Sequence, residues 1–269
     1  MSRELRVLPV EGLPEVREGD AVGELIAARV ELENGDVVVI SQKVVSKAEG
    51  QVRQLSEIEP SERAQELAKQ LGKEAALVEL ILSESREVLR AERDILITET
   101  HHGFVCANSG IDASNLPDED TVCLLPRDPD ASARRIREEL MAATEEPGVR
   151  LAGPSPLLSA ESHPRLPPAV VITDSFGRAW RLGQSEIAIG CAGLVPMDDW
   201  RGRADSQGQE LKATVIAIAD EVAAAADLVR GKDEGVPAAI VRGLSRYVQE
   251  GDGPGAVALR RPSGEDLFR

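Results

Sequence analysis

The chain has 269 residues and a formal net charge of -16 at neutral pH. So acidic a chain does not offer the broad basic surface that binds nucleic acid or anionic membranes. Aromatic residues make up only 2% of the sequence, so few side chains could stack on bases and the core must be aliphatic. Any anionic ligand must therefore meet a small local group of cations or a bound metal ion.

No run approaches the roughly 18 to 20 apolar residues of a membrane span, and nothing after Met1 resembles a signal peptide. The sequence therefore predicts a cytoplasmic protein. The three cysteines, Cys106, Cys123 and Cys191, are odd in number and lack Cys-x-x-Cys spacing. They are expected to be buried thiols and not disulfide or zinc ligands.

The first strand is predicted from Leu5 to Val10. A helix capped by Asp20 follows, with Val22, Leu25, Ile26 and Val30 as its apolar stripe. The next run, from Asp36 to Ile40, is apolar on both faces, which is typical of a central strand in a sheet.

The segment from Ser41 to Gly50 reads as a polar loop and holds two of the chain's few lysines, Lys43 and Lys47, beside Gln42. Lysine in such a loop can act as a point charge on a phosphate group. A solvated surface loop explains the same residues, and the local pattern does not decide between the two.

Two helices are predicted next. The first has Ser61 as its cap and Gly72 as its end. The second is expected from about Glu74 to Arg90, and a strand from Asp94 to Thr98 follows it.

A second polar loop, from His101 to Asn115, is rich in side chains that bind oxygen-seeking ions. Adjacent histidines on a strand point to opposite faces, so His101 and His102 are poor candidates for one zinc ion. Local turn chemistry could equally explain the Asn and Asp residues. The oxygen donors are Asn108, Ser109, Asp112, Ser114 and Asn115.

A strand from Thr121 to Leu125 leads to a helix from about Ala131 to Ala143. Its arginines are most simply a solvated face: Arg134, Arg135 and Arg137. The following segment, residues 145–168, is rich in Pro, Gly and Ser and is expected to be a functional loop or a crossing between subdomains.

The stretch from Val170 to Pro196 organises the second half of the chain. A β-branched run leads into Asp174 and Ser175, and a second aliphatic run, from Ile187 to Val195, is expected to be a core strand. A carboxylate and a hydroxyl at a strand end can hold a cation against phosphate oxygens. An ordinary turn is the alternative at that point.

Beyond this stretch, residues 211–218 alternate like a half-buried strand. Asp220 is expected to cap an alanine-rich helix that stops at Gly231, within a glycine-containing turn of residues 230–235. The last strand is predicted from Val236 to Val241. From residue 245 onward Gly, Pro and charged residues predict a loosely held tail.

The sequence has neither a P-loop nor a dinucleotide-binding glycine fingerprint, and no G-x-S-x-G motif. Pattern alone thus predicts an α+β (mixed α/β) protein with mixed β-sheets and flanking helices. It also predicts a candidate metal and phosphate site on the polar loops.

Several motifs in one order extend this reading, because together they resemble the coenzyme F420-0:L-glutamate ligase (F420 gamma-glutamyl ligase) family. The resemblance covers about residues 5–244, a catalytic domain of residues 1–244 followed by a tail of residues 245–269. The motifs are Val10-Glu11-Gly12-Leu13-Pro14, Val45-Ser46-Lys47-Ala48-Glu49-Gly50, Asn108-Ser109-Gly110-Ile111-Asp112-Ala113-Ser114-Asn115, Thr173-Asp174-Ser175, Gly177-Arg178 and Val241-Arg242-Gly243-Leu244.

The resemblance implies a ligase that joins L-glutamate by an amide bond to coenzyme F420-0, with further gamma-linked glutamates as an extension. GTP and divalent Mg²⁺ or Mn²⁺ at two sites would drive the reaction through an acyl phosphate, with K⁺ as an additional cation. It also implies the family's fold and an intertwined homodimer, with no nucleic-acid or membrane partner. This chemistry needs charge neutralisation at the phosphates above all.

The family's site residues carry over position by position. Asp112 and Asp174 resemble ligands of one divalent ion, and Ser175 resembles a ligand of a second. Gln42, Lys43 and Lys232 depart from the pattern: many members have Ser-Thr at the first two positions, and some have an acidic ligand at the third. The nucleotide contacts implied are Leu13, Pro14, Glu15, Val16, Gln42, Lys43, Lys47, Asn115, Arg230, Gly231 and Lys232, with Lys47 also the candidate for a catalytic role.

Two other functions stay open. A non-catalytic protein that binds the nucleotide or the deazaflavin could keep this fold, as the three departures would allow. A ligase for a related carboxylate acceptor is the other alternative.

Overall fold

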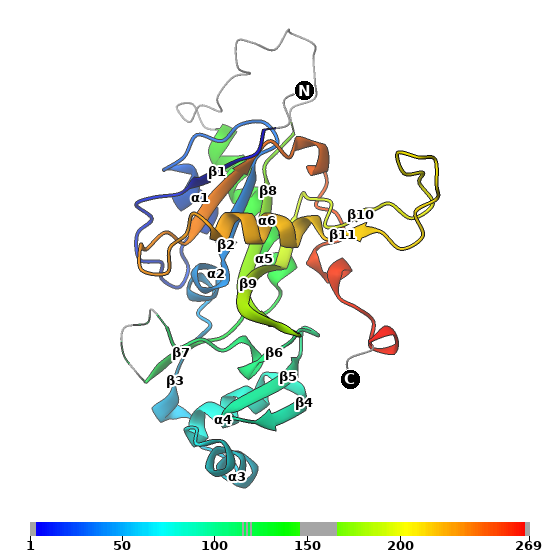
Figure 1. Ribbon diagram of the computed structural model, residues 1–269. Coiled ribbons are helices and arrows are strands. Elements are labelled where there is room, and N and C mark those ends of the chain that lie inside the picture. The colour runs from blue at the N-terminus through cyan, green and yellow to red at the C-terminus, as the bar shows by residue number, and fades with distance from the viewer. Residues whose placement is uncertain (1–3, 115, 117, 119, 146–165, 267–269) are drawn as a thin grey trace.

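A computed structural model of the chain describes residues 4–114, 116, 118, 120–145 and 166–266. Its centre is a five-stranded sheet in the order β1-β12-β2-β8-β9 (Figure 1). Only the β2–β8 pair is parallel. The strands of this sheet are β1 (Arg6–Pro9), β2 (Val37–Ser41), β8 (Ala169–Arg178), β9 (Arg181–Ala192) and β12 (Ala238–Arg242).

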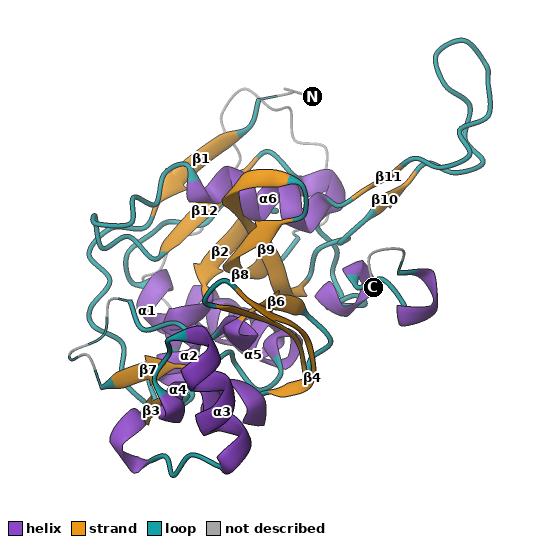
Figure 2. Ribbon diagram, turned by 60° about the horizontal axis from the view of Figure 1, so that its bottom comes forward, coloured by secondary structure: helices purple, strands orange, loops and turns teal. Residues whose placement is uncertain are grey.

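Apolar side chains on both faces of this sheet build the core, as its β-branched runs predict. One face packs against α1 (Val22–Ala27), α2 (Gln42–Ala48) and α5 (Pro129–Glu145), and the other packs against α6 (Ile218–Asp227) (Figure 2). Alternate residues of β2 serve the two faces, since Val38 and Ile40 join the first cluster and Val37 and Val39 the second. The prediction of a central strand at residues 36–40 is confirmed.

The lower part of the molecule in Figure 1 is a smaller helical and β layer. Ser61 Oγ accepts a hydrogen bond from the Ala64 amide and Gly72 adopts φ +63°, so the predicted helix begins and ends as expected. The second helix was predicted too long, because it stops at Ser83 and a bulged hairpin replaces its second half. The elements are α3 (Glu62–Leu71), α4 (Ala75–Ser83), β3 (Val52–Gln54), β7 (Thr121–Cys123), β4 (Ser85–Glu92), β5 (Ile95–Thr100) and β6 (Val105–Ala107).

The predicted loop at residues 41–50 is wrong, because α2 begins immediately after β2. Val44, Val45 and Ala48 give it a buried face against the main core, which outweighs the polar residues between them. Asp20 is not a helix cap either. Its carboxylate accepts the Arg17 amide at 2.8 Å in the preceding turn, and Ala21 occupies the cap position.

Residues 198–216 form a projecting hairpin with only two short paired strands, β10 (Asp198–Asp199) and β11 (Val215–Ile216) (Figure 1). The strand predicted from 211 to 218 is thus mostly loop. Asp220 lies inside α6 and not at its cap, since its carboxylate accepts the Ala188 amide of β9 at 2.9 Å.

Residues 249–256 are packed against α5 and β9, so the expectation of a loosely held tail is wrong for this part of the chain, whereas residues 261–265 are exposed. Arg137 is buried and not solvated as predicted. Its guanidinium donates to the Pro168, Gln249 and Glu250 carbonyls and pairs with Asp252 at 2.7 Å. Ala256 is also buried in the second core cluster.

These features confirm a mixed α/β protein with several sheets and flanking helices. The three cysteines are free and buried, as predicted. Among the described helices, none is both long and apolar enough to cross a membrane. The Pro- and Gly-rich segment near residues 145–168 lies almost entirely outside the described residues.

Candidate functional site

A cavity of about 400 Å³ brings together nearly all the residues that the sequence singled out. Asn115 lies outside the described residues. The cavity is lined by residues from six parts of the chain. The predicted ones are Leu13, Pro14, Glu15, Val16, Gln42, Lys43, Lys47, Asp112, Asp174, Ser175, Arg230, Gly231 and Lys232, and Ser114, Glu186, Asp227 and Asp233 are among the others.

The parallel pairing of β2 and β8 explains why distant segments meet here. Ser41 at the end of β2 lies opposite Thr173 of β8, so Lys43 at the start of α2 and Asp174 lie at the same edge of the sheet. Asp174 and Ser175 are consecutive in a strand, so their side chains point to opposite faces. One strand therefore supplies both sides of the cavity. Since β8 runs on to Arg178, these residues lie within a strand and not in a turn.

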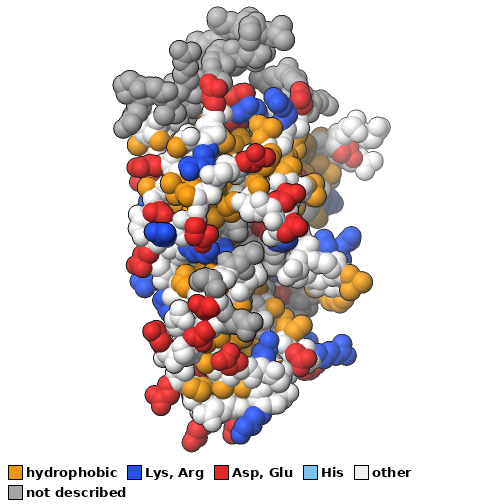
Figure 3. Space-filling view, turned by 90° about the vertical axis from the view of Figure 1, so that its left-hand side faces the viewer, with side chains coloured by type: hydrophobic (Ala, Val, Ile, Leu, Met, Phe, Trp, Pro, Cys, Tyr) orange, Lys and Arg blue, Asp and Glu red, His pale blue; other side chains and the backbone are white. Residues whose placement is uncertain are grey.

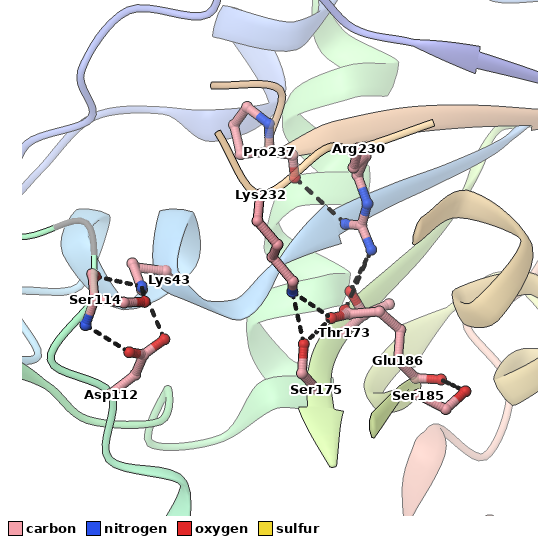
Figure 4. A network of polar contacts seen from close by, with 10 residues as sticks. All are labelled: Lys43, Asp112, Ser114, Thr173, Ser175, Ser185, Glu186, Arg230, Lys232 and Pro237. Atoms are coloured by element: carbon pink, nitrogen blue, oxygen red, sulfur yellow. Dashed lines mark hydrogen bonds and ion pairs between the residues drawn. The ribbon is translucent and has the colours of Figure 1, made fainter. Parts of the chain in front are cut away.

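On one side of β8, Lys43 forms an ion pair with Asp112. The Lys43 ammonium lies 2.8 Å from the Asp112 carboxylate and donates to the Ser114 carbonyl and hydroxyl (Figure 4). Burial alone would raise the pKa of Asp112, but hydrogen bonds from Lys43 and Ser114 lower it below its ordinary value. Asp112 is therefore ionised at neutral pH and already has a cation beside it.

Asp174 has the opposite balance. Burial raises its pKa to about 7, and the negative charges of Glu186 and Asp112 add to the effect. Like charges near a buried carboxyl group disfavour its ionisation. A cation placed near Asp174 would relieve that repulsion and restore the carboxylate.

On the other side of β8 lies Glu186, which no sequence motif indicated. It is directly opposite Ser175 in the β8–β9 register, and the Ser175 hydroxyl donates to its carboxylate. The Arg230 guanidinium donates to Glu186 at 3.2 Å and to the Thr173 hydroxyl at 3.1 Å (Figure 4). Burial opposes ionisation of Glu186, but hydrogen bonds from Ser175 and Thr173 and the charge of Arg230 lower its pKa.

Two further predicted residues lie at the rim or wall of the cavity. The Lys47 ammonium pairs with Glu15 at 2.5 Å, which joins α2 to the segment after β1. Gln42 is buried, and its side-chain oxygen accepts from Ser46 at 3.0 Å. Its amide nitrogen has no hydrogen-bond partner among the described residues.

The donor set on the Asp112 side suits a hard divalent cation. Mg²⁺ prefers oxygen ligands and is commonly held by one or two carboxylates together with substrate phosphates. Asp112 and Asp174 supply two carboxylates, and the pKa of Asp174 is raised first by burial and then by the negative charges of Glu186 and Asp112, which a cation would offset. Within the described residues no three His, Cys, Asp or Glu side chains could hold a metal ion together. Phosphate oxygens would have to complete the coordination.

The donor set around Ser175 suits a second cation poorly. Lys232 already donates to Ser175 at 2.8 Å, and Arg230 already neutralises Glu186. His101 and His102 lie in a separate cavity, where each ring contacts a different backbone carbonyl, that of Ser83 or Pro126.

The surface of the molecule fits the acidic composition. The face in Figure 3 carries acidic side chains over its whole height, with basic and hydrophobic ones interspersed (Figure 3). Fold and cleft together define a mixed α/β protein with a polar small-molecule cleft, where carboxylates face a local group of lysines and an arginine.

The comparisons with known proteins narrow this class. A family model described as F420-0:Gamma-glutamyl ligase matches residues 12–149 and 161–243. A coenzyme F420:L-glutamate ligase of Methanothermobacter thermautotrophicus is 43% identical over 98% of this chain and 99% of its own length. The enzyme of the same name from Archaeoglobus fulgidus is 44% identical over 90% of this chain and 88% of its own length. The one from Methanocaldococcus jannaschii is 41% identical over the whole length of both chains, 100% of each. The chain belongs to the F420-0:gamma-glutamyl ligase family.

Proposed function

We propose that this protein is a GTP- and divalent-metal-dependent ligase that adds L-glutamate to coenzyme F420-0 by an amide bond, through an acyl phosphate. Coenzyme F420-0, glutamate and GTP are the proposed substrates, and addition of further gamma-linked glutamates is the proposed extension. The observation that carries the proposal is the meeting of Asp112, Asp174, Lys43, Lys47 and Arg230 in one cleft of a family member.

The cleft residues fit a phosphoryl-transfer step. Lys43 lies in the first turn of α2 and Lys47 in its last turn, and both line the cleft, where their ammonium groups can balance phosphate charge. Asp112 and Asp174 would hold the Mg²⁺ or Mn²⁺ ion, which when bound neutralises charge on the phosphate oxygens. Lys47 is the candidate for direct contact with the transferred group.

The proposed reaction balances in two steps. A carboxylate oxygen of the acceptor bonds to the γ-phosphorus as the bond to GDP breaks. The glutamate amine then bonds to the acyl carbon, phosphate leaves, and the amine loses a proton. The chain's part is to hold the reacting groups in line and to keep water out.

We also propose that the protein acts as a homodimer in the cytoplasm. Trp180, in the turn between β8 and β9, and Leu182, at the start of β9, are 82% and 98% exposed. Two large apolar side chains at one exposed tip are typical of an interaction surface. They support the contact of one copy with another.

The decisive experiment is mass spectrometry of the product with authentic coenzyme F420-0, GTP, L-glutamate and Mg²⁺ or Mn²⁺. We expect a product heavier by one glutamyl unit, GDP, and loss of both with Asp174→Ala. Glu221→Ala, an exposed carboxylate on α6 outside the cleft, is the control and should keep the activity. Absence of product and GDP from the unaltered protein would refute the proposal.

One observation favours a second candidate, a binding protein without activity. Lys43 pairs with Asp112, and Lys232 donates a hydrogen bond to Ser175, so lysines contact two of the side chains that the family resemblance assigns as metal ligands. Calorimetry showing tight nucleotide binding without glutamate-dependent GDP release would support it. A panel of acceptors in the same assay would reveal a ligase for a related carboxylate.

A further inference from the structure

Lys232 makes contacts that no feature of the local sequence explains. Its ammonium lies 2.8 Å from the Ser175 hydroxyl and 3.6 Å from the Glu186 carboxylate. The lysine comes from the turn between α6 and β12, and its side chain crosses the cleft to reach β8 and β9 (Figure 4). Ser175 is thus bonded to a carboxylate on one side and an ammonium on the other.

The two sides of β8 differ in how their carboxylates are paired. On the Asp112 side, Lys43 pairs with Asp112, whereas no ion pair among the described residues joins a cation to Asp174, on which Lys232 acts only through its charge. On the Ser175 side, Arg230 and Lys232 both pair with the carboxylate of Glu186. Asp227 and Asp233 also line the cleft, but no described contact joins either to Ser175 or Glu186.

A divalent cation would meet different conditions on each side. Near Asp174 it would relieve repulsion between carboxylates. Near Ser175 it would have a neutral hydroxyl and a carboxylate already shared with a buried guanidinium, and it would repel the Lys232 ammonium. Lysine is a compact point charge that can bind phosphate directly.

We propose that the ammonium of Lys232 supplies, beside Ser175 and Glu186, the positive charge that a second divalent cation would supply. The protein then binds a single divalent cation with each nucleotide, on the Asp112 and Asp174 side. This inference rests on the proposed function, because it assumes that the cleft binds a nucleoside triphosphate.

The Lys232 side chain is 73% exposed, whereas those of Glu186 and Arg230 are each 5% exposed. The buried Glu186–Arg230 pair is therefore held in place, and the exposed side chain of Lys232 is the part that can move. When phosphate enters, the ammonium can turn from Ser175 toward a phosphate oxygen without disturbing the pair. Glu186 is a positioning residue here, since it acts through Ser175 and Arg230.

The test counts bound Mn²⁺ in the full-length protein. Free Mn²⁺ is measured by electron paramagnetic resonance during titration, with a saturating non-hydrolysable GTP analogue present. The variants are Lys232→Gln and Lys232→Glu, with Lys212→Glu on the projecting hairpin as the matched exposed control. The charge changes of Lys232→Glu and Lys212→Glu are identical, so only position differs.

We expect one Mn²⁺ per chain in the unaltered protein and in Lys212→Glu, and a second Mn²⁺ in Lys232→Glu. In Lys232→Gln the second ion should bind more weakly than in Lys232→Glu. Two ions in the unaltered protein would overturn the inference, and so would one ion in Lys232→Glu. If product still forms in the glutamate-addition assay, the proposed function survives that result. If neither nucleotide nor Mn²⁺ binds, both fail together.

Discussion

Replacement of Asp174 by Asn should stabilise the metal-free protein while it abolishes the proposed activity. The folded protein raises the pKa of Asp174 from 3.8 to about 7. At about 1.4 kcal/mol per pH unit, this shift of roughly three units costs at most about 4 kcal/mol of folding free energy. An amide of the same shape does not ionise and escapes that cost.

The sign of the pH dependence follows from proton binding. As pH rises through about 4, the unfolded chain loses the Asp174 proton while the folded chain keeps it until about pH 7. This group therefore lowers stability progressively between those values, and its full cost is present above pH 7. The advantage of Asp174→Asn should be absent at pH 4 and largest at pH 8.

The assay is urea unfolding followed by circular dichroism in the presence of a chelator, at pH 4, 5, 6, 7 and 8. Glu221→Gln is the matched carboxylate-to-amide control, because Glu221 is exposed on α6. Added Mg²⁺ with GTP should stabilise the unaltered protein more than the variant, since only the former has the second carboxylate. A variant no more stable at pH 8 than the unaltered protein, or a gap independent of pH, would refute the reasoning.

Two further predictions concern regions away from the cleft. Arg137→Met should destabilise the protein by roughly 3–5 kcal/mol in urea unfolding, because it leaves buried carbonyls and Asp252 without their cation. Arg134→Met is the control. Equal effects of the two substitutions would contradict the role assigned to Arg137. Changing Trp180 and Leu182 together to Ser should shift the protein from dimer toward monomer in sedimentation velocity, and an unchanged sedimentation coefficient would show that this tip is not the contact.

Local signals predicted some elements to the residue. The helix α3 begins after Ser61 and ends before Gly72 as expected, because a cap hydrogen bond and a left-handed glycine depend only on neighbouring residues. Asp20 and Asp220 were also predicted to be helix caps, but neither of them caps a helix. Asp220 is bonded to the amide of Ala188, a partner 32 positions away that no local pattern reveals.

The sequence indicated many of the residues that line the cleft, but it did not indicate how their charges are paired. Motif order indicated Asp112, Asp174 and Lys47, and all three line one cavity. Glu186 was missed because it lies in an ordinary polar run of β9, and only the hairpin register places it opposite Ser175. Arg137 was misread as solvated for the same reason, since its partners Gln249, Glu250 and Asp252 follow more than 100 residues later.

The insertion of β12 between β1 and β2 has a consequence for how the chain is made. A ribosome that has released only the first 237 residues has produced β1 without its hydrogen-bonding neighbour and left one edge of β2 open. The cleft is equally incomplete, because residues 13–16 and 230–237 face each other only after that last strand is in place. Completion of the central sheet must therefore wait until β12 has been synthesised, and during that interval the exposed β2 edge is open to pairing with other chains.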